Sequence, residues 1–444
     1  MTSEPAAPAA PRPPARPGPP VPLNRPLGPG RRRPAGEGPL THHLRRTMAR
    51  GFRPPASWDV PVRYLLPGRP QDGTGRPEEA AAALRTPPGR PGIAMVVPTY
   101  VTRTGLARQR EWFGALLDQA ATAARDHPRV PLVLFVGMQW SSAGEETESL
   151  RRLRVLLEDA RARLPGLRVC GLSLPGPGKP RTLNGAIAVA ELLGCAGVGW
   201  ADDDVVLAEG CLSALVRDFL AAGCRGAVGA TKIAHTHTYA TSRLLSRAKA
   251  IAAPATGYPH GCCLLVATDV VSGGLPGRYL SDDGYVCYRL LDPALPDPLA
   301  QLRLVPDARC HYYVAGPAGE TRRRIRRLLL NHLVDVADWP LPVVRYYIGH
   351  VLFGGMWPLT GFDSSRGVRH GVQKALIKWL YFAWFAGVGG ELYARGLLGR
   401  PLRGIEWAPY SDIRRLTPSS SSSSPSSPSP SDASGPSSSM PQES

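Results

Sequence analysis

Three consecutive aspartates, Asp202, Asp203 and Asp204, close an apolar segment of the sequence. Successive side chains of a strand point to opposite faces, so Asp202 and Asp204 should share one side while Asp203 faces the other. Two carboxylates on the same side of a cleft repel each other, and a divalent cation relieves that repulsion and can bridge them to a diphosphate. The alternative is a solvated turn in which one aspartate caps the next helix. Three acids directly after a buried strand favour the metal site.

A second acidic pair, Asp282 and Asp283, stands at the start of an expected helix in the segment YLSDDGYVCYRLL. A carboxylate in this place can act as a general base that deprotonates an acceptor hydroxyl while the hydroxyl attacks a sugar carbon. Plain N-capping by Ser281 or Asp282 is the alternative, and the pair taken alone favours the cap.

Two basic segments have the composition to face an anion. Residues 319–333, GETRRRIRRLLLNHL, crowd arginines onto one short stretch of helix, which suits a departing nucleoside diphosphate or, alternatively, a solvated or membrane-facing basic face. Residues 176–187, GPGKPRTLNGAI, indicate a loop from which Lys179 projects a charge and where Asn184 opens or caps a helix. A simple loop and helix start would also explain this second segment.

All these residues need elements that bring them together. Helical patterns separate apolar runs that are typical of buried strands, at 93–99, 130–138, 167–174 and 197–207. Strands alternating with helices predict parallel βαβ units with helices on both faces of the sheet. The strands are continuous apolar runs, as buried parallel strands should be. Ligands of such sheets bind beyond the carboxyl ends of the strands, where Thr99, Gln139 and the Asp202–Asp204 group lie.

The order and spacing of these motifs resemble family-two glycosyltransferases of the GT-A fold, which include cellulose, hyaluronan and chitin synthases and ceramide glucosyltransferases. The similarity covers residues 93–330, with VVPTY at 96–100, KPRTLN at 179–184, the D-x-D pair of Asp202 and Asp204, the Asp282–Asp283 pair and RRIRR at 323–327. The resemblance implies an α/β, Rossmann-like and mostly parallel sheet with helices on both faces, and a helical segment after it.

The resemblance also implies roles for individual residues. Asp283 would be the catalytic base with Asp282 supporting it, Asp204 would bind Mg or Mn, and Asp202 would touch the metal or the donor ribose. His260 and Gly261 match the segment that faces the acceptor. The remaining positions would border the nucleotide-sugar donor or hold its diphosphate: Pro98, Thr99, Gln139, Lys179, Asn184, Arg323, Arg326 and Arg327.

Two departures from the family pattern affect the details. The family usually has an aspartate after the second strand that contacts the nucleotide base, whereas this chain reads FVGMQWSSAGEE, so either the amide of Gln139 makes that contact or the contact is lost. Arg327 stands where the family usually has a tryptophan that lies by the acceptor in processive synthases. The short apolar segments near the C-terminus likewise argue against a polymer channel, which needs several spanning helices.

Composition divides the 444 residues into four parts. Residues 1–92 are a Pro- and Arg-rich arm and residues 417–444 a Ser- and Pro-rich tail, and both are expected to be disordered because they cannot bury enough apolar surface. Residues 93–338 are expected to form the GT-A domain, and residues 339–416 a helical segment. Much of the net charge of +18 lies in the arm, which is interpreted as solvated rather than as a nucleic-acid-binding element.

The expected location is the cytoplasm, at the inner face of the cell membrane. The eight cysteines form no C-x-x-C pair and stand mostly in apolar stretches, which indicates reduced, buried thiols. The N-terminus has no signal-like apolar core. Residues 346–362 and 379–390 are too short for normal spanning helices, and their aromatic content fits either an interfacial or re-entrant segment or a buried helix pair.

Taken together, the sequence predicts an inverting glycosyltransferase that moves a sugar from a nucleotide-sugar donor to a hydroxyl of a glycan or lipid. Glycosyl transfer to polyprenyl phosphate is an alternative, and so is a catalytically inactive GT-A domain that serves as a binding or scaffold protein. A nucleotidyltransferase also uses paired aspartates, but no clear Gly-rich phosphate loop follows the first strand.

Overall fold

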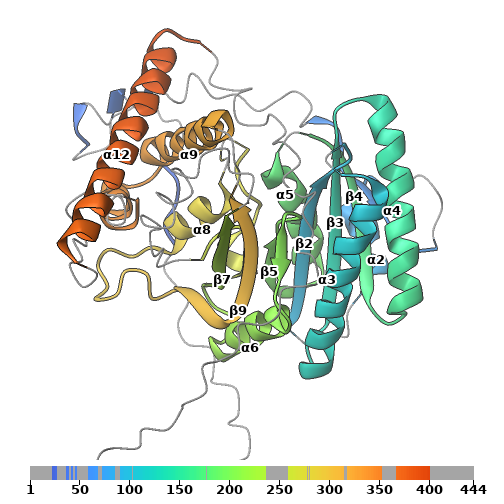
Figure 1. Ribbon diagram of the computed structural model, residues 1–444. Coiled ribbons are helices and arrows are strands. Elements are labelled where there is room, and N and C mark those ends of the chain that lie inside the picture. Colours follow the sequence, from blue (N-terminus) through green and yellow to red (C-terminus); the bar gives the residue numbers. More distant parts are fainter. Residues whose placement is uncertain are drawn as a thin grey trace, which may run out of the picture.

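The computed structural model contains one nine-stranded sheet with the strand order β1-β4-β3-β2-β5-β8-β7-β9-β6 (Figure 1). Position 279 aside, the residues that the structure describes are 23–27, 37–39, 42–43, 46–47, 59–68, 73–85, 91–102, 104–176, 178–236, 259–277, 281–314, 318–352 and 367–400. The predicted Ser- and Pro-rich tail at 417–444 lies outside them, as does most of the N-terminal arm.

One half of the sheet is parallel, as predicted. Strands β2 (Gly92–Tyr100), β3 (Leu132–Trp140), β4 (Arg168–Pro175) and β5 (Cys195–Ala201) all run in the same direction. Nearly every residue of these strands is buried, because helices cover both faces of the sheet. The predicted α/β fold class with parallel βαβ units is confirmed.

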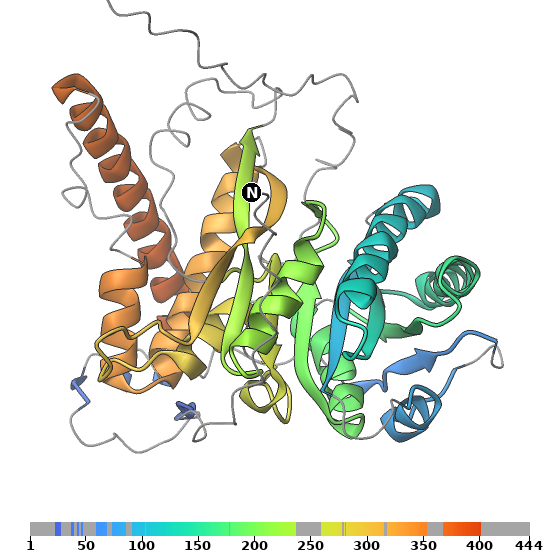
Figure 2. The same ribbon diagram turned by 90° about the horizontal axis from the view of Figure 1, so that it is seen from below.

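The helices between these strands take opposite faces of the sheet. Helix α3 (Leu106–Asp126) packs against both α4 (Ala143–Arg163) and α6 (Cys211–Ala221) on one face. Helix α5 (Lys179–Leu192) packs against β2 and β5 on the other face, beside α2 (Pro77–Ala83) (Figures 1 and 2). The start of α5 and the end of β5 therefore meet at the carboxyl edge of the parallel strands.

The other half of the sheet mixes parallel and antiparallel pairs. Strand β8 (Cys263–Ala267) pairs antiparallel with β5 and with β7 (Ala227–Thr236), β7 runs parallel to β9 (Leu302–Val314), and β9 pairs antiparallel with β6 (Val205–Leu207). Because Ala201 pairs with Cys263, the residues just before β8 lie at the same edge as the residues just after β5. The antiparallel insertion thus adds His260 and Gly261 to the edge where the parallel strands end.

The sheet begins within the stretch that was predicted to be a disordered arm. Strand β1 (Arg63–Leu65) pairs antiparallel with β4, and Tyr64 and Leu65 are buried in the core. Helix α2 buries Ala80 and Ala81 against the rest of the domain. The folded domain therefore starts before residue 93, because these few apolar residues suffice to bury a short edge strand and one helix.

The part of the chain after β8 is largely helical. It contains the 3-10 turn η2 (Thr268–Val270), α8 (Asp282–Leu290), α9 (Ala318–Asp338), α10 (Leu341–Tyr346), the π-helical turn η3 (Tyr347–Leu352) and α12 (Val368–Leu397). Part of the predicted apolar segment at 346–362 lies beyond η3 and outside the described residues. Among the helices that are described, none is both long and apolar enough to cross a membrane.

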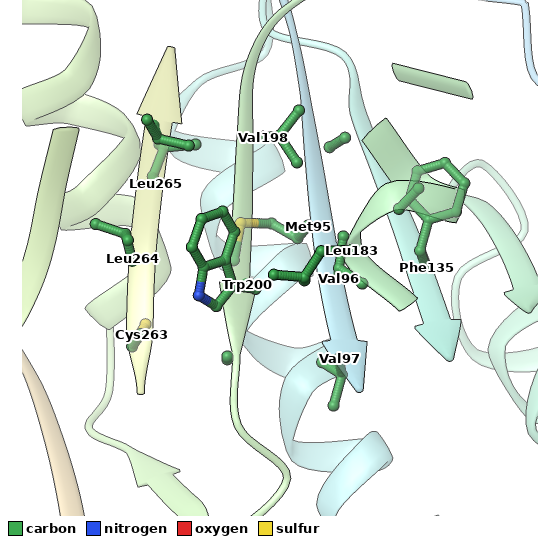
Figure 3. Packing of buried hydrophobic residues seen from close by; sticks show 14 of the residues in the cluster. Met95, Val96, Val97, Phe135, Leu183, Val198, Trp200, Cys263, Leu264 and Leu265 are labelled. Atoms are coloured by element: carbon green, nitrogen blue, oxygen red, sulfur yellow. The ribbon is translucent and has the colours of Figure 1, made fainter. Parts of the chain in front are cut away.

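The hydrophobic core lies in the middle of the sheet and leaves the polar strand ends at its edge. Figure 3 shows core side chains such as Met95 of β2, Trp200 of β5 and Leu264 of β8, all buried. All eight cysteines are free thiols. Because Trp200 is the second-last residue of β5, the acidic run begins directly where the core ends.

Candidate functional site

Lys179 joins four segments of the chain at the carboxyl edge of the sheet. Its Nζ lies 2.7 Å from Asp202 Oδ1 and 2.8 Å from Asp282 Oδ2, and it donates a hydrogen bond of 2.7 Å to the carbonyl oxygen of Gly261. The same ammonium lies 6.0 Å from the centre of the Trp200 ring, within reach of a cation–π interaction. One buried ammonium thus connects the start of α5, the end of β5, the turn before β8 and the start of α8.

The charges of this group stabilise one another. Burial alone would lower the pKa of Lys179, but the carboxylates of Asp202 and Asp282 raise that pKa above its usual value, so Lys179 stays charged. Burial raises the pKa of Asp282 to about 6 although Lys179 opposes this rise. Burial likewise raises the pKa of Asp202, and the nearby charge of Asp204 adds to the effect. Two carboxylates therefore share one ammonium.

Gln139 fixes the turn that presents Lys179. Its Oε1 accepts a hydrogen bond of 3.0 Å from the Gly178 N–H, and its Nε2 donates to Gly178 O at 2.9 Å and to Thr182 Oγ1 at 2.7 Å. Gly178 has φ +147°, a conformation that favours glycine. Gln139 is 5% exposed. The amide predicted to contact the nucleotide base is therefore already bonded on both of its polar atoms.

Within the first acidic run, Asp203 is set apart from its neighbours. It is buried, and Thr99 Oγ1 on β2 donates a hydrogen bond of 2.6 Å to its Oδ2. Pro98, the residue before Thr99, is buried in β2. Asp202 is half-buried and Asp204 is exposed. Strand β5 ends at Ala201 and Asp203 and Asp204 lie in the turn before β6, so this turn and the bond to Thr99, rather than strand alternation, separate Asp203 from its neighbours.

The second acidic run begins α8, and its cap is Ser281. The Gly284 N–H donates a hydrogen bond of 3.0 Å to Ser281 Oγ and one of 2.9 Å to Asp283 Oδ1. Ser281 Oγ also donates to Asp283 Oδ1. The Gly261 N–H donates a bond of 3.1 Å to Asp283 Oδ2, and His260 Nδ1 lies 3.7 Å from the same oxygen. The sequence-predicted acceptor pair, His260 and Gly261, is thus brought to the predicted base.

The two aspartates of this run differ in accessibility and in the direction in which their pKa values are shifted. The side chain of Asp283 is 22% exposed, whereas that of Asp282 is 6% exposed. Burial would raise the pKa of Asp283, but His260, Ser281 and the Gly261 N–H hold it below its ordinary value. Asp283 is therefore an ionised, reachable carboxylate, and Asp282 is a buried one.

The turn before β8 leaves no room for a side chain at Gly261. A Cβ atom on Gly261 would lie 2.6 Å from Asp282 Oδ2, closer than carbon and oxygen atoms pack. The close approach lets the carbonyl of Gly261 reach Lys179 while its N–H reaches Asp283. The backbone of Gly261 thus bonds Asp283 directly and is linked to Asp282 through Lys179.

Helix α9 supports this turn through polar residues that the sequence analysis did not single out. Asn331 Oδ1 accepts a hydrogen bond of 2.8 Å from the Ser281 N–H, and its Nδ2 donates one of 2.9 Å to Asp335 Oδ2. His332 Nδ1 lies 3.7 Å from Asp335 Oδ2, and all three side chains are buried. An Asn, a His and an Asp among the leucines of the same helix were the available signal.

The predicted diphosphate-binding arginines are divided between different surroundings. Arg326 Nη2 donates to Glu391 Oε1 of α12 at 2.8 Å, and Arg322 Nη2 donates to Glu391 Oε2 at 3.2 Å. The side chain of Arg326 is 17% exposed. Arg327 is half-buried, and the side chain of Arg323 lies outside the described part of the structure. Arg326 thus connects α9 to α12.

Asn184 also has a structural partner. Its Nδ2 donates to Leu275 O at 2.8 Å, and its Oδ1 accepts from the Leu275 N–H at 2.7 Å. Gly274 next to it has φ +82°, and a Cβ there would lie 2.8 Å from Asn184 Oδ1. Asn184 therefore ties α5 to the loop between η2 and α8.

A divalent cation fits this edge only together with a ligand. Among the residues that the structure describes, no three His, Cys, Asp or Glu side chains are grouped to hold a metal ion. Asp202 Oδ1 already accepts from Lys179, while a third of the Asp202 side chain remains open to solvent and Asp204 is exposed. Magnesium is commonly held by one or two carboxylates plus substrate phosphates, and these two residues suit that arrangement.

No family model and no curated protein match the sequence. The structure is similar to a mannosyltransferase from Pyrobaculum calidifontis in complex with GDP-mannose and Mn2+, at 17% identity and a TM-score of 0.41, over 72% of this chain and 92% of that one. It is also similar to a UTP-bound UGPase from Acinetobacter baumannii, at 11% identity and a TM-score of 0.29, over 51% of this chain and 87% of that one. At these values, neither likeness says what this chain binds.

Proposed function

We propose that the chain is an inverting, nucleotide-sugar-dependent glycosyltransferase of the family-two type, with Asp283 as its base. The observation that carries the proposal is that Lys179 pairs with Asp202 and Asp282 at the carboxyl edge of the parallel strands and is linked through the backbone of Gly261 to Asp283. Ligands of open α/β sheets bind at this edge. The sequence resemblance assigns the same three aspartates to the donor and the acceptor.

The reaction would be one direct displacement. An acceptor hydroxyl approaches Asp283 and gives its proton to that carboxylate while its oxygen attacks the anomeric carbon of the sugar. The bond from this carbon to the diphosphate breaks, and the configuration at the carbon inverts. His260, Ser281 and Gly261 hold Asp283 ionised, so it can accept a hydrogen bond from the incoming hydroxyl.

Charge on the leaving diphosphate must be neutralised as it departs. Mg or Mn, held by Asp202, Asp204 and the diphosphate, would supply a Lewis acid there. Lys179 keeps Asp202 oriented through its ion pair. Arg323 and Arg327 remain candidates for contact with the diphosphate, and Arg326 would act there if it exchanged its bond to Glu391 for one to phosphate.

The acceptor belongs to the glycans or the lipids, and the protein would act in the cytoplasm at the inner face of the membrane. A polyprenyl phosphate is the alternative acceptor. Its attacking oxygen already lacks a proton at neutral pH, so transfer to it would not need Asp283 as a base. Loss of activity in Asp283→Asn therefore also separates the two acceptor classes.

A donor screen tests the proposal. The full chain is incubated with UDP-, GDP-, ADP- and dTDP-sugars, with Mg or Mn and a membrane extract as acceptor source, and released nucleoside diphosphate is measured. We expect metal-dependent release from one donor and its reduction by about 10²- to 10⁴-fold in Asp283→Asn. The matched control is Asp118→Asn, which changes an exposed aspartate on α3. Release that is unchanged in Asp283→Asn would reject this base.

A second candidate is a GT-A domain that binds a nucleotide sugar without transferring it. Three predicted donor-contacting side chains, Gln139, Asn184 and Arg326, already have protein partners, which favours this alternative. Calorimetry of donor binding, set beside the diphosphate-release assay, separates the two candidates. An inactive domain would bind a donor and release no diphosphate with any acceptor source. The proposed enzyme would bind the donor and release diphosphate.

A further inference from the structure

Helix α12 presents its apolar side to solvent. The side chains of Val372, Leu376, Trp379 and Leu380 are 54%, 60%, 50% and 64% exposed. Val372 lies four residues before Leu376, and Trp379 and Leu380 lie three and four residues after it. Positions at this spacing share one face of a helix. Phe385, Val388 and Leu392 of the same helix are buried against the domain, so α12 carries exposed apolar residues in addition to its packed apolar side.

Few polar residues of α12 are exposed beside this apolar face. Among its exposed positions from Val372 to Leu398, Gln373 is the one polar residue in the described part of the helix, and the others are apolar, Ala or Gly. Lys378 is buried, and Glu391 is bonded to Arg322 and Arg326 of α9. The ion pairs of Glu391 and the buried apolar residues Phe385, Val388 and Leu392 therefore attach the helix to the domain, while the apolar residues from Val372 to Leu380 remain exposed.

The position of α12 makes this face accessible to a large partner. The helix lies at the periphery of the molecule in both ribbon views, with α9 on its inner side (Figures 1 and 2). It runs over 30 residues, yet it is not apolar enough to span a membrane. A long helix with one apolar side and few charges on it can instead lie in the plane of an interface.

The net positive charge of α12 indicates which kind of partner covers its exposed apolar face. Four basic residues of α12, Arg369, Lys374, Lys378 and Arg395, stand against the single acid Glu391, which is already neutralised by α9. Arg369 and Arg400 are exposed at the two ends of the apolar face. Tryptophan and flanking basic residues suit the boundary between acyl chains and headgroups. A second copy of this positive helix would meet like charge.

We propose that α12 docks the protein on an anionic membrane, with Val372, Leu376, Trp379 and Leu380 inserted among the lipids and the exposed Arg369 and Arg400 at the level of the headgroups. Helix α9 packs against both α12 and α8, which carries Asp283. Docking through α12 therefore holds the carboxylate site close to the membrane surface, where a lipid-linked acceptor would be met. The proposal concerns binding alone and stands without the transferase activity.

Vesicle flotation of the full chain, without any sugar donor, tests it. The vesicles are phosphatidylcholine with or without phosphatidylglycerol. We expect the protein to float with the anionic vesicles, and the double variant Leu376→Glu/Leu380→Glu to bind them at least about tenfold more weakly because apolar contact is lost. The matched control is Leu192→Glu/Val206→Glu, which alters two side chains of similar exposure away from α12 and should float like the parent.

Three results would overturn the proposal. The first is that the parent protein does not float with anionic vesicles. The second is equal flotation of the α12 double variant and the control, which would place binding elsewhere, for instance in the basic arm. The third is a dimer in light scattering that the α12 variant converts to monomer while flotation is unchanged, which would make a second copy the occupant. Circular dichroism confirms that both double variants are folded.

Discussion

The two acidic runs each bury one carboxylate and leave its neighbour more accessible, although one run follows a strand and the other starts a helix. In the run after β5, Asp203 is buried against Thr99 while Asp204 is exposed. In the run that starts α8, Asp282 is buried against Lys179 while Asp283 is reachable. Each run thus places one acid where it holds the site together and its neighbour where a ligand can come.

The difference between the runs lies in what each buried acid is bonded to. Asp203 accepts from a neutral hydroxyl on the adjacent strand, so its bond is local to the sheet. Asp282 faces a charged ammonium that it shares with Asp202, so its bond joins the two runs. Removing the partner of Asp282 should therefore disturb the molecule more than removing the partner of Asp203.

The largest effect is expected for Lys179→Met. The change leaves Asp202 and Asp282 without their shared cation, and breaking a buried ion pair in this way costs about 3–5 kcal/mol. Urea unfolding measures the loss. Arg163→Met removes the cation of an exposed pair with Asp118 and should cost less than about 1 kcal/mol. Equal losses in the two variants would show that Lys179 is not the centre of this edge.

The next effect is a pH dependence of stability that arises from Asp335 of α9, which is linked through Asn331 to Ser281 at the start of the second run. Burial raises the pKa of Asp335 from 3.8 to about 6 despite the nearby His332, so the folded state holds this proton more tightly than the unfolded state. Stability contributed by Asp335 is therefore lost as pH rises from about 4 to about 6, by on the order of 3 kcal/mol.

Asp335→Asn should remove that dependence and keep an acceptor for Asn331. Unfolding of the parent and the variant is compared across the same pH range, so the other titrating groups cancel. As pH rises, the free energy of unfolding of the variant should increase relative to that of the parent. A constant difference between the two proteins would mean that Asp335 does not hold its proton in the folded state.

The smallest effect is expected for Thr99→Val in the first run. The variant keeps the shape of the side chain but leaves the buried carboxylate of Asp203 without the hydroxyl that donates to it, at a cost of about 1–3 kcal/mol. Thr122→Val, on the surface of α3, is the control and should be close to neutral. If Thr99→Val destabilised the protein as much as Lys179→Met, the proposed difference between the runs would be wrong.

The sequence predicted the elements of the parallel half well because buried parallel strands are continuous apolar runs. It also placed Thr99, Gln139 and Asp202 correctly at strand ends. It could not say which carboxylates are bonded, because Lys179 reaches Asp282 and Arg326 reaches Glu391 across long stretches of chain. Such pairs are set by packing and leave no local pattern.

Other features were hidden for different reasons. Strand β1 is short and lies in a Pro-rich stretch, so composition outweighed its apolar pair of Tyr64 and Leu65. Asn331 stands in a helix whose arginines dominated the interpretation, and its role depends on contact with Ser281. The exposed face of α12 was visible only as aromatic content, because the side facing solvent is settled by how the helix packs on α9.

The central claim is that Asp283 is the base while the buried Asp282 stabilises the site. Its most direct test compares Asp283→Asn with Asp282→Asn. Diphosphate release from the donor found in the screen and urea unfolding are measured on both variants. The account predicts that Asp283→Asn loses release while its stability changes little, and that Asp282→Asn keeps the larger share of release and shifts the unfolding midpoint. The opposite pattern, with release lost in Asp282→Asn and kept in Asp283→Asn, would contradict it.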